Sequence, residues 1–290
     1  MINNIPKSED FENLGLQCIW KSFEMLFKIG NQYNELTSVE DSGIIEEEIS
    51  ENDYWKYHEI TIRTSLIILY QGVEYLMKMK ISEQSPLLLP DNKPNEWPTL
   101  PQKTNKSFEE LQTISGRNLL SVFGGIITTK FKLKEFVDEF ENIRIKRNKL
   151  VHSIGIKELG QRYVIEECLY FLSLFYYKQK WLDFFRDMYV SEPTKGYLDD
   201  IEIEETAFYK VLNFIEKEIG KRKLNKHTDF NSEAIRYLCP ECTRWIEEMG
   251  EDSHEAKWSF LTPNKPESEK IKCLICNKEY AVKRENCPEE

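Results

Sequence analysis

Histidine is scarce in this chain, with four among 290 residues, and the sequence motifs of several large enzyme classes are missing. There is no P-loop, no glycine fingerprint of dinucleotide-binding folds, no His-Glu-x-x-His and no Gly-x-Ser-x-Gly. These absences set aside P-loop, dinucleotide-dependent, zincin and α/β-hydrolase chemistry. With so few histidines, we also do not expect a catalytic metal held by imidazoles.

Long apolar runs are missing as well. No stretch approaches the ~18 consecutive apolar residues of a membrane-spanning helix, and the opening Met-Ile-Asn-Asn-Ile-Pro-Lys has no signal-peptide core. Seven cysteines, an odd number, do not suggest a secreted disulfide framework. We therefore expect a cytoplasmic protein without a membrane partner, with room for one medium domain and one small one.

The net charge of −11 argues against broad binding of nucleic acids, but the local balance of charge differs along the chain. Between Lys130 and His152 there are seven Lys and Arg against four Asp and Glu. A protein that grips a single phosphate step needs only a local basic patch of this kind.

That basic segment is also an amphipathic helix, predicted from Phe131 to His152. At 100° per residue, Arg147 projects to about the middle of its apolar stripe, Asn148 lies at the edge, and His152 is one turn further on the Asn148 side. An arginine in this position must be paired, or must open into a cleft or an interface, because burying an unpaired charge is prohibitive. The apolar stripe comprises Leu133, Phe136, Val137, Phe140, Ile143, Leu150 and Val151.

The segment Arg147-Asn148-Lys-Leu-Val-His152 resembles the signature of the HEPN family (higher eukaryotes and prokaryotes nucleotide-binding domains), an Arg, a polar residue and, after a few variable positions, a His. The Arg-to-His spacing alone is weak, because Arg222 and His227 fit it too. Three features favour the first match: its Asn, the apolar helix before it and the long apolar helix after it. The resemblance covers roughly residues 10–220.

The resemblance implies a metal-independent endoribonuclease in which the RNA 2′-hydroxyl is the nucleophile. His152 would be the general acid or base, Arg147 would bind the scissile phosphate, and Asn148 would orient the His or the phosphate. Family members are commonly homodimers, and many are toxins or effectors of bacterial stress response and phage defence that cut tRNA or mRNA. Two alternatives stay open: a catalytically silent module that binds nucleotides or RNA, and a purely structural role with a capping His152 and an ion-paired Arg147.

Two Cys-x-x-Cys pairs, Cys239 with Cys242 and Cys273 with Cys276, form the ligand set of a tetrahedral structural Zn²⁺ site. Four thiolates close the coordination shell, so the site is expected to be structural. We predict a zinc-ribbon module over residues 231–290, with strands near 258–261, 271–274 and 279–282, that could serve as an adaptor for a protein partner. Two disulfides or a redox pair are the alternative, and His254 and Cys287 are reserve ligands.

The remaining pattern predicts an all-α fold over residues 1–225, an antiparallel helical bundle of HEPN type with a Pro-rich insertion at 83–106. Gly124-Gly125 are expected to break the chain before the motif helix. In the second helix two sides are apolar, which indicates the centre of a bundle or a subunit contact. Glu74 in that helix matches an extra carboxylate of the family, but its spacing to Gln71 and Lys78 favours a polar strip with a helical ion pair. Besides the motif helix, helices are expected at 11–36, 53–81, 161–190 and 203–223.

Overall fold

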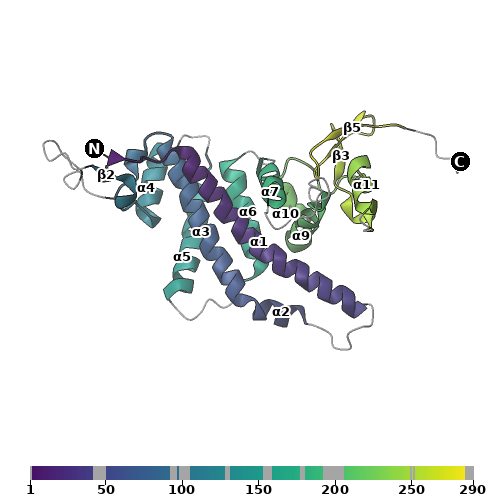
Figure 1. The fold of residues 1–290 in the computed structure, drawn as a ribbon, viewed down its shortest axis with the longest axis horizontal. Coiled ribbons are helices and arrows are strands. Elements are labelled where there is room, and N and C mark those ends of the chain that lie inside the picture. The colour runs from purple at the N-terminus through teal and green to yellow at the C-terminus, as the bar shows by residue number, and fades with distance from the viewer. Residues whose placement is uncertain are drawn as a thin grey trace. The chain divides into compact units, whose positions relative to one another are not determined.

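The computed structural model describes residues 2–41, 50–91, 97, 105–127, 131–152, 159–176, 180–191, 206–248, 250 and 252–284. The chain divides into two compact units, Met1–Phe175 and Tyr176–Glu290, whose folds are shown in Figure 1. The described residues are mostly helical, which confirms an all-α class with a small sheet near the C-terminus. None of the helices in this described part combines the length and apolar character that crossing a bilayer requires.

The first unit is a bundle of long helices joined by shorter elements (Figure 1). Helix α3 lies at its centre and contacts α1, α4, α5 and α6. The two apolar sides of α3 are therefore used within the bundle. Its elements are β1 (Ile2–Asn3), α1 (Ser8–Asp41), α2 (Glu51–Tyr57), α3 (Glu59–Ser82), η1 (Pro86–Leu88), β2 (Lys106–Ser107), η3 (Phe108–Glu110), α4 (Gly116–Ile126), α5 (Leu133–His152) and α6 (Gln161–Phe175).

Helices α1 and α3 meet at two glycines. A Cβ atom added to Gly72 would lie 2.8 Å from Ile19 Cγ1 and 3.0 Å from the Gly15 carbonyl oxygen, and one added to Gly15 would lie 2.8 Å from Leu76 Cδ2. The backbones approach closely because neither position carries a side chain. The crossing buries apolar side chains of four helices: Ile19, Phe23, Leu26, Leu66, Leu69, Val73, Phe136, Phe140, Ile143, Val164, Phe171 and Leu172.

The second unit combines helices with an antiparallel sheet of order β3-β4-β5. In this sheet Phe260 is paired with Lys272, and Ile271 with Tyr280. Its three strands lie within one residue of the predicted ranges at both ends. The elements are α7 (Lys180–Val190), α9 (Tyr209–Ile219), α10 (Lys221–His227), α11 (Pro240–Glu248), η4 (Ser253–Ala256), β3 (Ser259–Leu261), β4 (Lys270–Cys273) and β5 (Glu279–Ala281).

Helices α7, α9 and α10 are tied to the cysteine-bearing segment and to one another. Trp181 Nε1 of α7 donates to the His227 carbonyl at 2.7 Å, and Trp258 Nε1 donates to Asn213 Oδ1 of α9 at 2.8 Å. The predicted boundary between the two domains lies between residues 225 and 231, whereas the compact units of the structure divide after Phe175. Helices α7 and α9, which were predicted to belong to the bundle, contribute buried side chains to the core of the second unit.

Three predicted helices are each divided in two in the structure, and one predicted break is absent. The helix expected over 53–81 is interrupted at His58, and Gly220, with φ of +77°, separates α9 from α10. Helix α6 ends at Phe175 and α7 begins at Lys180, in place of one helix over 161–190. Gly124-Gly125 lie inside the last turn of α4 instead of breaking the chain. Apolar periodicity continues across such breaks, so it does not reveal them.

Candidate active site and metal centre

Helix α5 carries the three predicted active-site residues, and its first half anchors it to the bundle. Phe136, Phe140 and Ile143 are fully buried. The stripe opens toward the C-terminal end, where Leu150 is half-buried and Val151 is 47% exposed. The part of the stripe that contains Arg147 is therefore only partly covered by the described residues of the chain.

Arg147 is half-buried and has no carboxylate partner among the described residues. Its Nη1 atom donates to Asn148 Oδ1 at 3.0 Å, and its guanidinium carbon lies 5.4 Å from the centre of the Tyr70 ring. Its Nε atom is buried without a hydrogen-bond partner in the described structure. An unsatisfied donor on a half-buried cation is costly, so this guanidinium is available for an anion. The motif places Arg147 beside Asn148 in the sequence, but no sequence pattern indicates the contact with Tyr70.

Tyr70 is held in place by a buried carboxylate. Its hydroxyl donates to Glu74 Oε1 at 2.9 Å, and the same oxygen accepts the Gly116 N–H at 2.7 Å. Burial, followed by the nearby Glu74 carboxylate, raises the pKa of Tyr70 above its ordinary value, so the phenol stays protonated. Glu74 is only 5% exposed and binds the N-terminus of α4, a favourable place for negative charge. It positions the ring beneath Arg147, whereas Lys78, its expected ion-pair partner, donates from Nζ to Thr113 Oγ1 at 2.9 Å.

Arg144, one turn before Arg147, is paired with a carboxylate. Its Nε and Nη2 atoms donate to both oxygens of Glu141, at 3.0 and 2.7 Å. These hydrogen bonds lower the pKa of Glu141, and Arg117 adds a longer ion pair of 3.9 Å. Of these two neighbouring arginines on α5, Arg147 is the one without a carboxylate partner in the described structure.

His152 is the last residue of α5 and is exposed. No described residue forms a hydrogen bond with its imidazole, so the ring is accessible but not oriented. The competing motif match consists of Arg222 and His227. His227 is buried, whereas Arg222 is exposed. A substrate could not reach those two side chains together.

On the α6 side of α5, two carboxylates share a buried polar cluster. Asn142 Nδ2 donates to Glu139 Oε1 at 2.6 Å, the Tyr163 hydroxyl donates to the same oxygen at 3.3 Å, and Lys146 Nζ lies 3.4 Å from the centre of the Tyr163 ring. Burial, and then the Glu139 carboxylate, raise the pKa of Glu167 to about 9. Glu167 therefore holds a proton at neutral pH, which leaves one negative charge beside the Lys146 ammonium.

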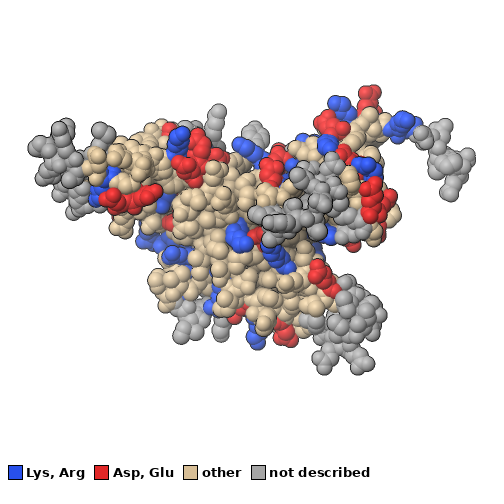
Figure 2. Space-filling view, in the orientation of Figure 1, with Lys and Arg blue, Asp and Glu red and all other residues tan. Residues whose placement is uncertain are grey.

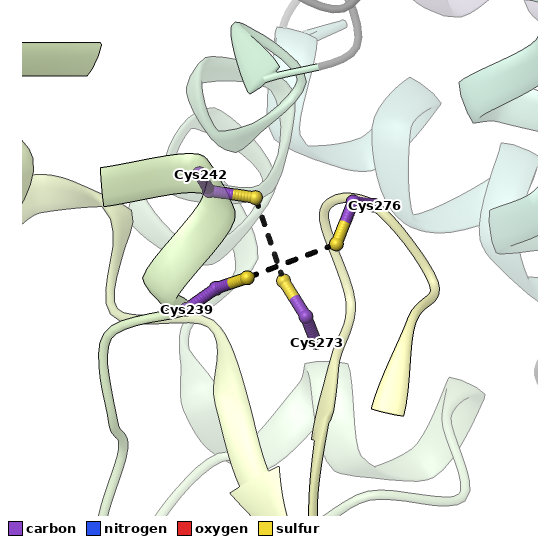
Figure 3. A group of neighbouring side chains, drawn as sticks. All are labelled: Cys239, Cys242, Cys273 and Cys276. Carbon is purple, nitrogen blue, oxygen red and sulfur yellow. Dashed lines mark hydrogen bonds between the residues drawn. The ribbon is translucent and has the colours of Figure 1, made fainter. Parts of the chain in front are cut away.

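The four predicted metal ligands converge in the second unit (Figure 3). Cys239 Sγ lies 3.8 Å from Cys276 Sγ, and Cys242 Sγ lies 3.8 Å from Cys273 Sγ. All four sulfurs lie within 4.8 Å of one another, and none is in a disulfide. Zn–S bonds of about 2.3 Å in a tetrahedron require sulfurs about 3.8 Å apart, so the spacing fits a metal ion.

Local structure explains why these thiols face one another. Cys239 and Cys242 lie at the N-terminus of α11, where the helix dipole favours thiolates, while Cys273 and Cys276 flank the turn between β4 and β5. The neighbouring Cys242, Cys273 and Cys276 thiols lower the pKa of Cys239. The two reserve ligands are not part of the cluster: His254 lies in η4, and Cys287 lies outside the described residues.

A second layer of side chains fixes the two cysteine pairs. Lys278 Nζ donates to Glu241 Oε1 at 2.7 Å, and the Tyr280 hydroxyl donates to the other Glu241 oxygen while lying 3.8 Å from Cys276 Sγ. From α7, the buried Arg186 donates from Nε to the Ile275 carbonyl at 2.5 Å and from Nη2 to the Leu274 carbonyl at 2.6 Å. These bonds hold the Cys-Leu-Ile-Cys turn.

Comparisons with protein-family models, curated proteins and solved structures gave no match. The functional argument therefore rests on the residues and their geometry.

Proposed function

We propose that this protein is a cytoplasmic, metal-independent endoribonuclease of HEPN type that cleaves RNA at α5. The observation that carries the proposal is Arg147: a half-buried guanidinium that contacts Asn148 and the Tyr70 ring, with no carboxylate partner among the described residues. A phosphate would supply the missing anion. Planar bidentate donors suit a phosphodiester, and Asn148 keeps the guanidinium from turning away.

In this mechanism, Arg147 binds the scissile phosphate and stabilises the charge that develops on it as the 2′-hydroxyl attacks. His152, exposed at the helix end, accepts the hydroxyl proton or protonates the leaving 5′-oxygen. The products are a 2′,3′-cyclic phosphate and a 5′-hydroxyl. Asn148 positions the guanidinium, and Tyr70 supports it through cation–π contact.

The test is cleavage of tRNA and mRNA by the purified full chain in EDTA, with the ends identified chemically. We expect 2′,3′-cyclic phosphates, no cleavage of DNA, and at least a ~10²-fold loss of rate in His152→Ala. His254→Ala, which removes an exposed histidine of the second unit, is the matched control and should cleave normally. Full dependence on Mg²⁺, or an unchanged rate in His152→Ala, would contradict the proposal.

The active form is proposed to be a homodimer in which α5 of each protomer contributes an imidazole. One chain offers one His152, whereas acid and base are needed on opposite sides of the phosphate. Exposed apolar side chains near the ends of α3 and α5 support this contact: Ile60 is 71% exposed and Val151 is 47% exposed. Mixing excess His152→Ala chains with the native protein should lower activity faster than dilution, whereas a linear fall with a monomeric mass by light scattering contradicts the dimer.

The four-cysteine cluster is proposed to hold one structural Zn²⁺ per chain, since its sulfur spacing fits a tetrahedral ion and four thiolates leave no open position. Metal analysis should give about one Zn²⁺ per chain, with less in Cys276→Ser. A metal-free preparation with an ordered C-terminal unit would refute the site. We further propose a biological role as a toxin or effector in bacterial stress response or phage defence, with the cysteine-bearing module as an adaptor for a protein partner.

One observation favours a second candidate, a silent module that binds nucleotides or RNA. No described side chain orients the His152 imidazole, although general acid–base catalysts are usually held by a hydrogen bond. In that case the His152→Ala protein would bind RNA as tightly as the native protein, and neither would cleave it.

A further inference from the structure

Helix α10 carries an unusual concentration of positive charge for a chain of net charge −11. Lys221, Arg222, Lys223 and Lys226 are exposed, and the helix contains no acidic residue. Lys221, Arg222 and Lys226 form no ion pair with any described carboxylate. Buried Leu224 anchors the helix, so its cations are presented in a fixed arrangement. On the face of the molecule in Figure 2, by contrast, basic and acidic groups are interspersed.

A cavity of about 440 Å³ adjoins the end of α10 in the same unit. Its walls combine apolar side chains with amide, carboxylate and ammonium groups. Two hydrogen bonds tie it to α10: Asn225 Nδ2 donates to Asn231 Oδ1 at 3.4 Å, and Asn225 Oδ1 accepts the Ser232 N–H at 2.7 Å. The cavity and the basic helix therefore keep one relative position. Its lining residues include Phe230, Asn231, Phe260, Asn264, Lys272 and Glu279.

The two features suit different parts of one ligand. A cavity with aromatic walls and both donors and acceptors fits a nucleobase, and its volume lies within the range of small-ligand pockets. Carboxylates in the lining disfavour phosphate inside the cavity but can accept a base N–H. Phosphates would instead lie outside, on the cations of α10. An acidic peptide would use the cations but would have no base for the cavity.

We propose that α10 and the adjoining cavity form a docking site for single-stranded RNA, with phosphates on Lys221, Arg222 and Lys226 and one base beside Phe230. The inference rests on the proposed function, because it assigns this surface to the RNA substrate. It explains how an acidic protein holds a polyanion, since the basic surface is local.

Binding can be measured by fluorescence anisotropy of a labelled oligouridine with the His152→Ala full chain, which leaves the RNA intact. The triple variant Lys221→Glu, Arg222→Glu, Lys226→Glu should bind at least about tenfold more weakly and with a shallower salt dependence. The control triple Lys7→Glu, Lys257→Glu, Lys283→Glu changes net charge equally on other exposed lysines and should bind less than about threefold more weakly.

The cavity is tested by Phe230→Leu, which removes the ring but keeps an apolar side chain, and Phe230→Trp, which keeps a stacking surface. We expect at least about fivefold weaker binding for Leu and near-native binding for Trp. Equal losses in the α10 and control triples, native binding by Phe230→Leu, or equal affinity for polyglutamate would overturn the docking site. If the docking variants lose RNA binding but the native chain never cleaves RNA, the docking site stands and the nuclease proposal fails.

Discussion

Arg186 on α7 donates a hydrogen bond to the carbonyl oxygen of Ile275, a residue 89 positions further along the chain that lies between Cys273 and Cys276. The guanidinium is buried and also binds the Leu274 carbonyl and Asp183. A buried charge with all these partners is stable only while the turn keeps its shape. The turn that carries Cys273 and Cys276 is thus held by helix α7, which precedes the other helices and strands of the second unit in the chain.

Replacing Arg186 should therefore weaken the metal centre. In Arg186→Leu, two turn carbonyls lose their donors, and we expect a loss of about 2–4 kcal/mol in unfolding free energy of the second unit. Competition with a chromophoric chelator should show weaker Zn²⁺ retention. Arg244→Leu, at an exposed arginine on α11, is the control and should change neither quantity. Native metal retention in Arg186→Leu would show that the cysteines hold the turn unaided.

The α1–α3 crossing predicts strong sensitivity at Gly72. A Cβ there meets both Ile19 and the Gly15 carbonyl, so Gly72→Ala should separate the helices and cost about 1–3 kcal/mol in urea unfolding. Gly125 lies in a helix with nothing within 4 Å of an added Cβ. Gly125→Ala should be neutral or slightly stabilising, because alanine favours helix. Similar behaviour of the two variants would argue against a close crossing.

The contrast between Arg147 and Arg144 predicts unequal roles in RNA cleavage. Arg147→Ala should lower the cleavage rate by at least about 10²-fold, because it removes the cation proposed to bind the phosphate. Arg144 is engaged by Glu141, so Arg144→Ala should reduce the rate by less than about tenfold. Single-turnover cleavage of one labelled RNA compares the two, and equal losses would mean that the ion pair opens during catalysis.

Glu167 predicts a pH-dependent stability of the bundle. Its folded-state pKa of about 9 lies above the ordinary value of 4.5, so the native state retains a proton that the unfolded chain has released. Stability is highest below about pH 4.5 for this group and falls as pH rises toward 9. Glu167→Gln should remove this fall and stabilise the protein at pH 8 by on the order of 1–3 kcal/mol. Denaturant unfolding at pH 6 and 8 measures it, with the exposed Glu135→Gln as control.

Local chemistry made part of this structure predictable. The tetrahedral coordination of zinc is sufficient reason to assign the two Cys-x-x-Cys pairs to one site. The spacing of the apolar residues predicted the long helices. The relations that escaped prediction are long-range: Tyr70 under Arg147, Glu74 at the α4 N-terminus and Arg186 at the cysteine turn. Each joins residues far apart in sequence through tertiary packing, on which local patterns carry no information.

The cysteine pairs also set how the chain tolerates change in length. Cys242 and Cys273 are 31 positions apart yet nearly touch, so a metal ion there would close a long loop that contains η4 and β3. Loop-closure entropy rises only logarithmically, and doubling such a loop costs about 0.6 kcal/mol. Residues inserted in the turn between β3 and β4 would therefore weaken metal binding by less than threefold. The cross-link constrains its end points and leaves the intervening length free to vary.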